Sequence, residues 1–246
     1  MLMAIRSSRV LRCYNPCSTA RQAQHHNMQL SPLFPPSVVI VNSTEEMWLK
    51  PLCIEEEKLI EGSVTKRQRE FRAGRNAAHA ALRQLDAPAG PLLRGTKRQP
   101  IWPDGFIGSI SHCNDNCVAA CAIAGEIVSL GIDVEPLAPL KPGIARYIDT
   151  DEDKAFMQRH KDLPPRLIFS AKESLYKCYY PLVERFFGFQ SVSLDIDASR
   201  QQFQFRPSAA CTIEFPQNLH FHGRYLITER HLYTGCYLTI AMPVKD

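Results

Sequence analysis

Several features that mark other classes of protein are missing from this sequence of 246 residues. No apolar run reaches the roughly 20 residues that a membrane-spanning helix needs, because Arg, Lys, Asp or Pro interrupts each one. No low-complexity tract is present, and 45% hydrophobic with 22% charged residues is typical of a globular protein. The net charge of +4 and the pI near 8.6 lie below the values usual for dedicated nucleic-acid binders. The sequence therefore predicts a soluble, folded protein without a membrane span.

Paired cysteine spacing is also missing, although the chain has nine cysteines. An odd number without paired spacing, in a chain of this size, favours reduced thiols in a cytoplasmic setting. Cys113, Cys117 and Cys121 lie four residues apart beside His112. Structural zinc sites favour C-x2-4-C pairs with a second pair elsewhere. We therefore interpret these three cysteines as small buried side chains of a strand.

Acidic residues are absent from residues 1–28, where four arginines occur. This composition resembles that of a transit peptide. Globular patterning begins only after Met28, which favours a disordered extension or a start assigned too far upstream.

Two segments show the apolar spacing of amphipathic helices. In residues 63–85 one stripe is apolar and a second carries Arg72, Arg75, His79 and Arg83. Residues 166–182 place Leu167, Ile168, Ala171, Leu175 and Cys178 on one side. Residues 44–46 also predict the start of a helix.

Alternating segments predict strands around these helices. The expected strands are residues 33–41, 118–125, 127–135, 187–197, 202–207, 220–229 and 231–243. In 127–135 the apolar residues share one face, so Asp133 and Glu135 share the other, about 7 Å apart along the strand. Both parts of the chain thus contain a helix and several strands, which hints at duplication. We expect an N-terminal half at 29–127 and a C-terminal half at 128–246.

Each polar motif has an ordinary explanation when it is taken alone. Asp133 and Glu135 fit a solvated strand face. Glu173 and Lys177 fit a helical i,i+4 pair that contributes about 0.2–0.5 kcal/mol, and His112 fits a loop histidine. Taken together, two strand carboxylates, a helix carboxylate and several cations suit Mg²⁺ with a pyrophosphate group.

Five sequence blocks, in order, resemble the signature blocks of phosphopantetheinyl transferases. They run from about residue 66 to residue 188 and read KRQREFRAGRNAAHAAL, RQPIWPDG, GSISHC, SLGIDVEP and FSAKESLYKCYYPL. The combination is similar to the branch of the enterobactin-synthase transferase component. The resemblance implies an α+β monomer, a pseudo-twofold tandem of two similar halves, each a helix packed on a small, mostly antiparallel sheet. It also implies that coenzyme A binds in the cleft between the halves, and that apo acyl or peptidyl carrier proteins are the partners.

The resemblance also implies roles for individual residues. Asp133, Glu135 and Glu173 would hold Mg²⁺, Glu173 would also be a candidate base for the carrier serine, and Lys177 would contact the pyrophosphate. Positions that match contacts to the phosphates and the adenine side of coenzyme A are Arg67, Arg75, Lys97, Arg98, Ser111 and His112. Lys172 is a further candidate for a phosphate contact, and Phe187 is a candidate for contact with the pantetheine arm.

Two positions depart from the family pattern, because many relatives have Arg in place of His79 and Trp in place of Phe169. A histidine in contact with phosphate would weaken coenzyme A binding at alkaline pH, because its charge is lost near pH 6.5. Two other functions fit parts of the sequence: a nucleotide pyrophosphatase with water as the acceptor, and a non-catalytic module whose basic helix binds an acidic partner.

Overall fold

The computed structural model describes residues 30–241, and the interpretation of residues 1–28 lies outside them. The first part of the chain contains the helices η1 (Ser31–Leu33), η2 (Glu45–Trp48), α2 (Ile54–Glu57), η3 (Lys58–Ile60) and α3 (Thr65–Gln84), and the strands β1 (Val39–Asn42), β2 (Phe106–His112) and β3 (Cys117–Ile123). The second part contains the helices α4 (Ala145–Ile148), α5 (Asp151–Arg159), α6 (Leu167–Val183) and η4 (Phe189–Ser191), and the strands β4 (Ile127–Pro136), β5 (Val192–Asp197), β6 (Gln202–Pro207), β7 (Leu219–Ile227) and β8 (His231–Ile240).

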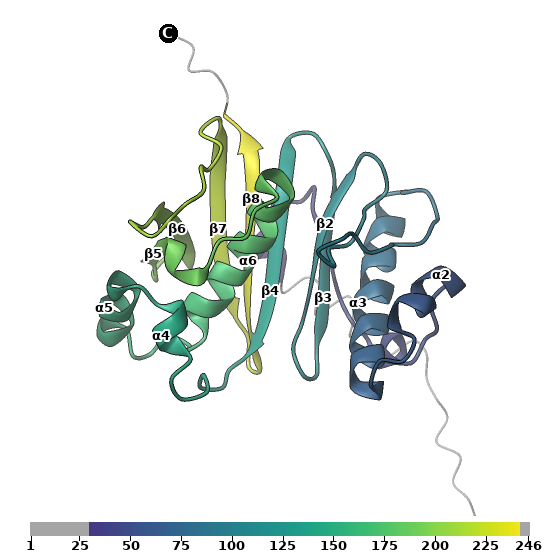
Figure 1. Cartoon of the computed structure of the whole chain (residues 1–246), viewed down its shortest axis with the longest axis horizontal. Coiled ribbons are helices and arrows are strands. Elements are labelled where there is room, and N and C mark those ends of the chain that lie inside the picture. Colours follow the sequence, from purple (N-terminus) through teal and green to yellow (C-terminus); the bar gives the residue numbers. More distant parts are fainter. Residues whose placement is uncertain (1–29, 242–246) are drawn as a thin grey trace, which may run out of the picture.

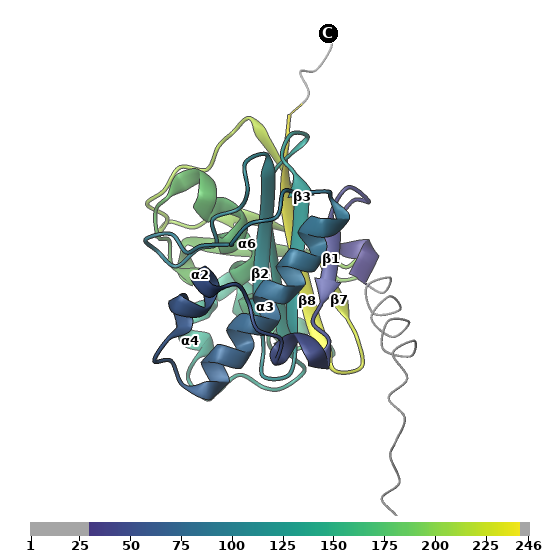
Figure 2. The same cartoon turned by 90° about the vertical axis from the view of Figure 1, so that its right-hand side faces the viewer.

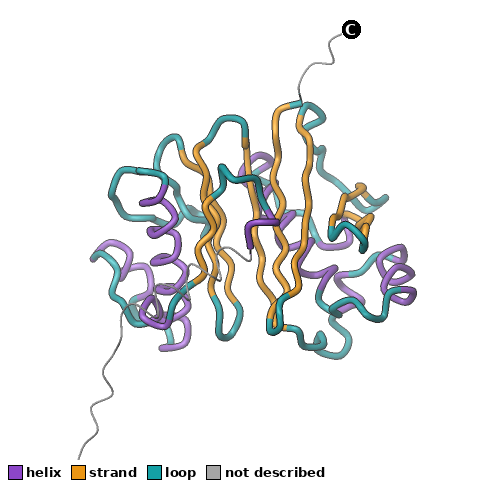
Figure 3. The backbone as a smooth tube through the Cα atoms, turned by 180° about the vertical axis from the view of Figure 1, so that it is seen from behind, coloured by secondary structure: helices purple, strands orange, loops and turns teal. Residues whose placement is uncertain are grey.

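The strands form two antiparallel sheets (Figure 1). The first has the order β1-β3-β2, and the second has the order β4-β8-β7-β6-β5. Helix α3 packs on the first sheet, as Figure 2 shows, and α6 packs on β4 and β8 of the second. From behind, the long strands of the two sheets occupy the middle of the molecule, and most of the helices lie toward its two flanks (Figure 3). The predicted α+β tandem of two helix-on-sheet halves is confirmed.

Helix α3 confirms the amphipathic helix that was predicted at residues 63–85. Its apolar residues Ala77, Ala78 and Ala81 are fully buried and pack in one cluster with residues of β1 and β3. The cationic stripe of α3 faces the acidic helix α2, where Glu57 accepts two hydrogen bonds from Arg72 at 2.8 and 2.7 Å. The stripe is therefore partly covered by protein.

Helix α6 lies directly on the polar face of β4. A methyl group at Gly131 would come within 2.0 Å of the Ser174 carbonyl oxygen, so only glycine allows this approach. Ser129 Oγ donates to the Cys178 carbonyl oxygen beside it. The carboxylate face of β4 is therefore covered by a helix, and the interpretation as a plain solvated strand face is wrong.

The two halves share a hydrophobic core. Leu33 and Phe34, at the start of the described chain, pack with β3, β4 and Tyr233 of β8 in one buried cluster. Phe34 lies against Gly235, where a methyl group would come within 2.6 Å of its ring. The predicted N-terminal half thus begins with residues that pack on the second sheet.

Some elements differ from the prediction. Strand β1 begins at Val39 and not at residue 33, because Ser31–Leu33 forms a 3-10 turn with a proline in it. The short helices α2, α4 and α5 were not predicted. Cys117 and Cys121 are buried in β3, as the sequence indicated. Cys113 is only partly buried and lies in the turn between β2 and β3, so its assignment to a strand is wrong. None of the helices in residues 30–241 is long and apolar enough to cross a membrane.

Candidate active site

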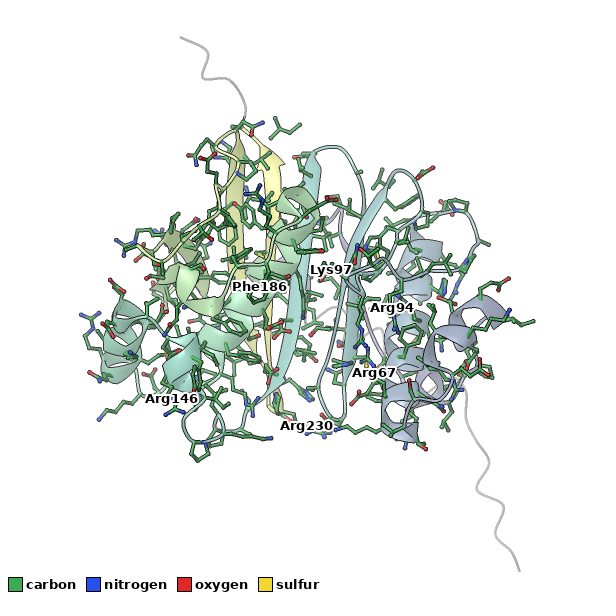
Figure 4. The ribbon with its side chains drawn as sticks, in the orientation of Figure 1. Arg67, Arg94, Lys97, Arg146, Phe186 and Arg230 are labelled. Carbon is green, nitrogen blue, oxygen red and sulfur yellow. The ribbon has the colours of Figure 1, made fainter. Side chains whose placement is uncertain are left out.

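A pocket of about 380 Å³ lies where the two halves meet. Its walls come from α3, from the loop before β2, and from β2, β4 and α6. The residues that line it are Arg67, Glu70, Phe71, Gly74, Arg75, Arg98, Pro100, Ile110, Ser111, His112, Asp133, Glu135, Phe169, Glu173 and Lys177. Figure 4 labels Arg67, Arg94 and Lys97 on the α3 side of the molecule and Phe186 on the α6 side.

Asp133 is the most fully bonded residue on the acidic side of the pocket. It is 3% exposed, and Lys177 Nζ lies 2.6 Å from its Oδ1 atom. Ser111 Oγ donates to the same oxygen at 2.7 Å, and Ser170 Oγ donates to Oδ2 at 2.8 Å. These donors come from β2 and α6, so Asp133 of β4 connects three elements.

The other two carboxylates are less fully paired. Glu135 accepts a hydrogen bond from Arg166, yet burial and the nearby Asp133 charge raise the pKa of Glu135. Burial likewise raises the pKa of Glu173, partly offset by Lys177, whose Nζ atom is 4.0 Å away. Among the described residues Glu173 has no closer polar partner. The carboxylates of this pocket thus repel one another.

This acidic side suits a hard divalent cation. Three carboxylates face two cationic side chains, Lys177 and Arg166, so a positive ion would relieve the repulsion, and carboxylate oxygens are the ligands that Mg²⁺ prefers. The three carboxylates do not form a closed ligand set. The oxygens of the three carboxylates do not all lie within 4.8 Å of one another. In the part of the chain that the structure describes, the only group of potential metal ligands that meets this distance is Cys113, Asp115 and His231. An ion shared with phosphate oxygens and water fits such an open arrangement.

The opposite side of the pocket is basic. Arg67 Nη1 and His112 Nε2 lie 2.8 Å apart, joining α3 to the end of β2. Arg75 is only 3% exposed and lies over the Phe71 ring, and Arg94 lies over the same ring. Burial lowers the pKa of Arg94, and the neighbouring charges of Arg67 and Arg98 lower it further. Clustered guanidinium groups with incomplete hydrogen bonding are typical of an anion site.

Comparison with known proteins identifies the family of this chain. A family model described as the 4′-phosphopantetheinyl transferase N-terminal domain matches residues 55–122, and one described as the 4′-phosphopantetheinyl transferase superfamily matches residues 129–230. The chain belongs to the 4′-phosphopantetheinyl transferase superfamily. The first matched segment ends in β3 and the second begins in β4.

Curated proteins of this superfamily resemble the chain over more than half of its length. The 4′-phosphopantetheinyl transferase Svp of Streptomyces mobaraensis is 39% identical over 157 residues, which is 62% of this chain and 64% of Svp. The transferase PptT of Mycobacterium tuberculosis is 38% identical, over 58% of this chain and 64% of PptT. Enterobactin synthase component D of Salmonella typhimurium is 36% identical, over 60% of this chain and 63% of that protein. The matches thus span slightly less than two thirds of each relative.

Most of the residues predicted from the family resemblance line this pocket. They are Arg67, Arg75, Arg98, Ser111, His112, Asp133, Glu135, Glu173 and Lys177. Phe169, which stands where many members of the family have Trp, lines it as well. Lys97 is exposed on the adjoining turn, where its backbone nitrogen donates to Gln99, and it lies outside the pocket wall.

The structure places Lys172 away from the pocket. Its Nζ atom donates to the Ile148 carbonyl oxygen and forms a fully buried ion pair with Asp153 at 2.5 Å. Successive helical residues point about 100° apart, so Lys172 faces α4 and α5 when Glu173 faces the pocket. Its expected role in phosphate binding is therefore corrected to a structural one.

Phe187 and His79 also differ from expectation. Phe187 is 6% exposed and packs in the C-terminal core against Tyr176 and Phe215, whereas Phe186 is 78% exposed. His79 lies outside the pocket wall, with its Nε2 atom 2.9 Å from Glu56 of α2. The expected contacts of Phe187 with pantetheine and of His79 with phosphate are therefore not supported.

Several residues of the site and its surroundings escaped the sequence analysis, among them Ser170, Arg166, Glu56 and Arg94. Ser170 donates to Asp133, and Arg166 donates to Glu135. Ser170 lies three residues before Glu173 and Arg166 lies seven before it, which places all three on one side of the helix and was the available signal. The two others, Glu56 and Arg94, lie in segments for which no element was predicted.

The group formed by Cys113, Asp115 and His231 is an ion-pair cluster between two hairpin turns. His231 Nε2 lies 2.9 Å from Asp115, and the exposed Arg230 donates to the same carboxylate. Burial raises the pKa of Cys113 to about 11, so its thiol is protonated at neutral pH. The Asp115 carboxylate is already paired with His231 and Arg230.

Proposed function

We propose that this chain transfers the 4′-phosphopantetheine group from coenzyme A to a serine hydroxyl of an apo acyl or peptidyl carrier protein. Adenosine 3′,5′-bisphosphate is the second product. The observation that carries the proposal is the pairing, in one pocket, of three carboxylates from β4 and α6 with guanidinium groups from α3 and the loop before β2. A diphosphate joined to a nucleotide needs such cations for its oxygens, and its reaction needs the acidic groups.

In the proposed reaction the serine oxygen forms a bond to the phosphorus that bears pantetheine. The bond from this phosphorus to the oxygen of the adenosine bisphosphate breaks, and the serine proton passes to Glu173, directly or through water. Burial raises the pKa of Glu173, which makes its carboxylate a stronger base than an exposed one. Arg67, Arg98 and His112 are placed to offset the negative charge of the leaving bisphosphate.

The proposal includes a requirement for Mg²⁺, held by Asp133, Glu135 and Glu173. When bound, the ion supplies Lewis acidity at the phosphate oxygens. Lys177, already 2.6 Å from Asp133, holds the neighbouring carboxylate in place and presents its ammonium group to the diphosphate.

The carrier protein belongs to the proposal only as a class. One of the similar Salmonella proteins is named as an enterobactin synthase component, so we include siderophore synthesis among the pathways served, with polyketide and nonribosomal peptide synthesis as the others. We further propose that the enzyme acts as a monomer in the cytoplasm, where coenzyme A is available and thiols stay reduced.

Intact-mass spectrometry tests this function. Candidate apo carrier proteins are incubated with the enzyme, coenzyme A and Mg²⁺, and the expected result is a gain of one phosphopantetheine on the carrier. Chelation of the metal should stop the gain, and added Mg²⁺ should restore it. Coenzyme A should stay intact when no carrier is present. Hydrolysis of coenzyme A with no change in any carrier would instead indicate a pyrophosphatase.

A further inference from the structure

A buried carboxylate stands behind the basic side of the pocket. Glu56 of α2 is 1% exposed and does not belong to the pocket wall. His79 Nε2 lies 2.9 and 3.1 Å from its two oxygens, the backbone nitrogen of Leu92 donates at 3.2 Å, and Cys53 Sγ donates at 3.2 Å. Burial alone would raise the pKa of Glu56, but the hydrogen bond from His79 helps to hold it below its usual value. The carboxylate is therefore ionised and fixed in place.

Arg75 lies between this carboxylate and the pocket. Its Nε atom is 3.9 Å from Glu56 Oε1, and its Nη2 atom donates to the Leu93 carbonyl oxygen at 3.4 Å. The guanidinium group lies over the Phe71 ring, 4.9 Å from the ring centre. Its buried Nε atom has no hydrogen-bond partner among the described residues. Arg75 thus keeps hydrogen-bonding capacity although its side chain is almost wholly enclosed.

The charges around Arg75 explain why a fixed counter-charge is needed. Burial lowers the pKa of Arg75 to about 10, and the nearby charges of Arg94 and Arg67 act in the same direction, whereas Glu56 opposes both effects. Without the carboxylate, a long arginine side chain with like charges beside it would tend to turn toward water. A guanidinium group held in one orientation loses less conformational freedom when an anion binds.

We propose that Glu56 is a positioning residue that fixes Arg75 for the phosphate groups of coenzyme A, with His79 as the second clamp on the Glu56 carboxylate. This inference rests on the proposed function. It also explains the histidine at position 79, which acts on the pocket through Glu56 and has no direct place in its wall.

A purely structural role for Glu56 is the competing explanation, because the residue also ties α2 to α3. The chain offers a matched control in the next residue. Glu57 ties the same two helices through two hydrogen bonds from Arg72, and neither of these residues lines the pocket. If tethering α2 were the whole effect, loss of either carboxylate would have the same consequence.

The test measures binding of coenzyme A by isothermal titration calorimetry, together with KM and kcat for transfer to an apo carrier. The variants are Glu56→Gln, Glu57→Gln, Arg75→Ala and the double variant Glu56→Gln/Arg75→Ala, each checked for folding by thermal unfolding. Glu56→Gln should weaken coenzyme A binding and raise KM about tenfold, with kcat changed less than about twofold. The double variant should bind no more weakly than Arg75→Ala, because the two residues act as one unit.

Glu57→Gln should leave coenzyme A affinity within about twofold of the wild type, even where it lowers the unfolding temperature. The inference is overturned if Glu56→Gln binds coenzyme A like the wild type, if both glutamine variants weaken binding equally, or if the Glu56 and Arg75 effects simply add. Should Glu56→Gln fail to fold, His79→Ala gives the decision, since it removes a hydrogen bond from Glu56 and leaves the pocket wall intact. Weaker binding in His79→Ala supports the inference, and unchanged binding overturns it.

Failure of the proposed function gives a different result. In that case the wild-type protein itself neither binds coenzyme A nor modifies a carrier, and the positioning role falls with it. If the wild type does both and Glu56→Gln is unaffected, only the positioning role is wrong.

Discussion

Lys177 of α6 and Asp133 of β4 are joined across the surface between helix and sheet, with Nζ 2.6 Å from Oδ1. The contact depends on Gly131, two residues before Asp133, because α6 lies directly on that residue. The acidic side of the pocket therefore depends on the close approach of α6 to β4.

Removal of one of the proposed metal-binding carboxylates should abolish transfer and leave the fold intact. Asp133→Ala and Glu173→Gln should each lower kcat by about 100-fold or more, because Glu173 is the proposed base and both carboxylates face the reacting phosphate. Transfer to a purified apo carrier measures the loss, and circular dichroism checks the fold. Full activity in either variant would contradict these assignments.

The pH dependence of stability should show the raised pKa of Glu173. A carboxyl group with a higher pKa in the folded protein contributes stability below its unfolded pKa, near 4.3 for Glu, and loses that contribution as the pH rises through the folded pKa. We therefore expect the free energy of unfolding of Glu173→Gln, measured with urea and without Mg²⁺, to increase relative to that of the wild type as the pH rises above the unfolded pKa. A difference that shrinks over this range would contradict the raised pKa.

A methyl group at Gly131 should separate α6 from β4. Gly131→Ala would place a carbon 2.0 Å from the Ser174 carbonyl oxygen and 2.7 Å from the Cys178 nitrogen. We expect a loss of about 1–3 kcal/mol or more in the free energy of unfolding, and a large loss of transfer activity because Glu173 and Lys177 move with the helix. Gly188→Ala is the control, since open space surrounds that residue. Equal stability of the two variants would count against the close approach.

The buried pair of Lys172 and Asp153 should matter for stability and not for binding. Lys172→Met leaves the Asp153 carboxylate buried without its cation, which typically costs about 3–5 kcal/mol. Coenzyme A affinity of the folded variant should stay within about twofold of the wild type, because the side chain lies away from the pocket. Lys154→Met, which breaks an exposed pair with Asp151, should have little effect on either quantity. A selective loss of coenzyme A binding in Lys172→Met would restore Lys172 to the phosphate site.

Regular patterns explain which elements could be predicted. Helices α3 and α6 lie within two residues of their predicted bounds, because each has a long apolar stripe at helical spacing. Strand β6 matches its prediction at both ends. Helix α5 was missed although Thr150 and Asp153 form a capping box at its start, a signal that was available. Helix α2 has one turn only, too short for any periodic pattern.

The sequence by itself determined which side chains are present for phosphate chemistry and which strand face carries Asp133 and Glu135, because alternation along a strand is a local property. Only the tertiary structure decided which cationic side chains lie beside these two carboxylates. Lys172 and Lys177 look equally suitable in the sequence, yet one is buried against Asp153 and the other lies beside Asp133. Helix α2 likewise brings Glu56 behind Arg75 through contacts between residues 19 positions apart. Such choices depend on how helices rotate and pack on the sheets, which no local pattern specifies.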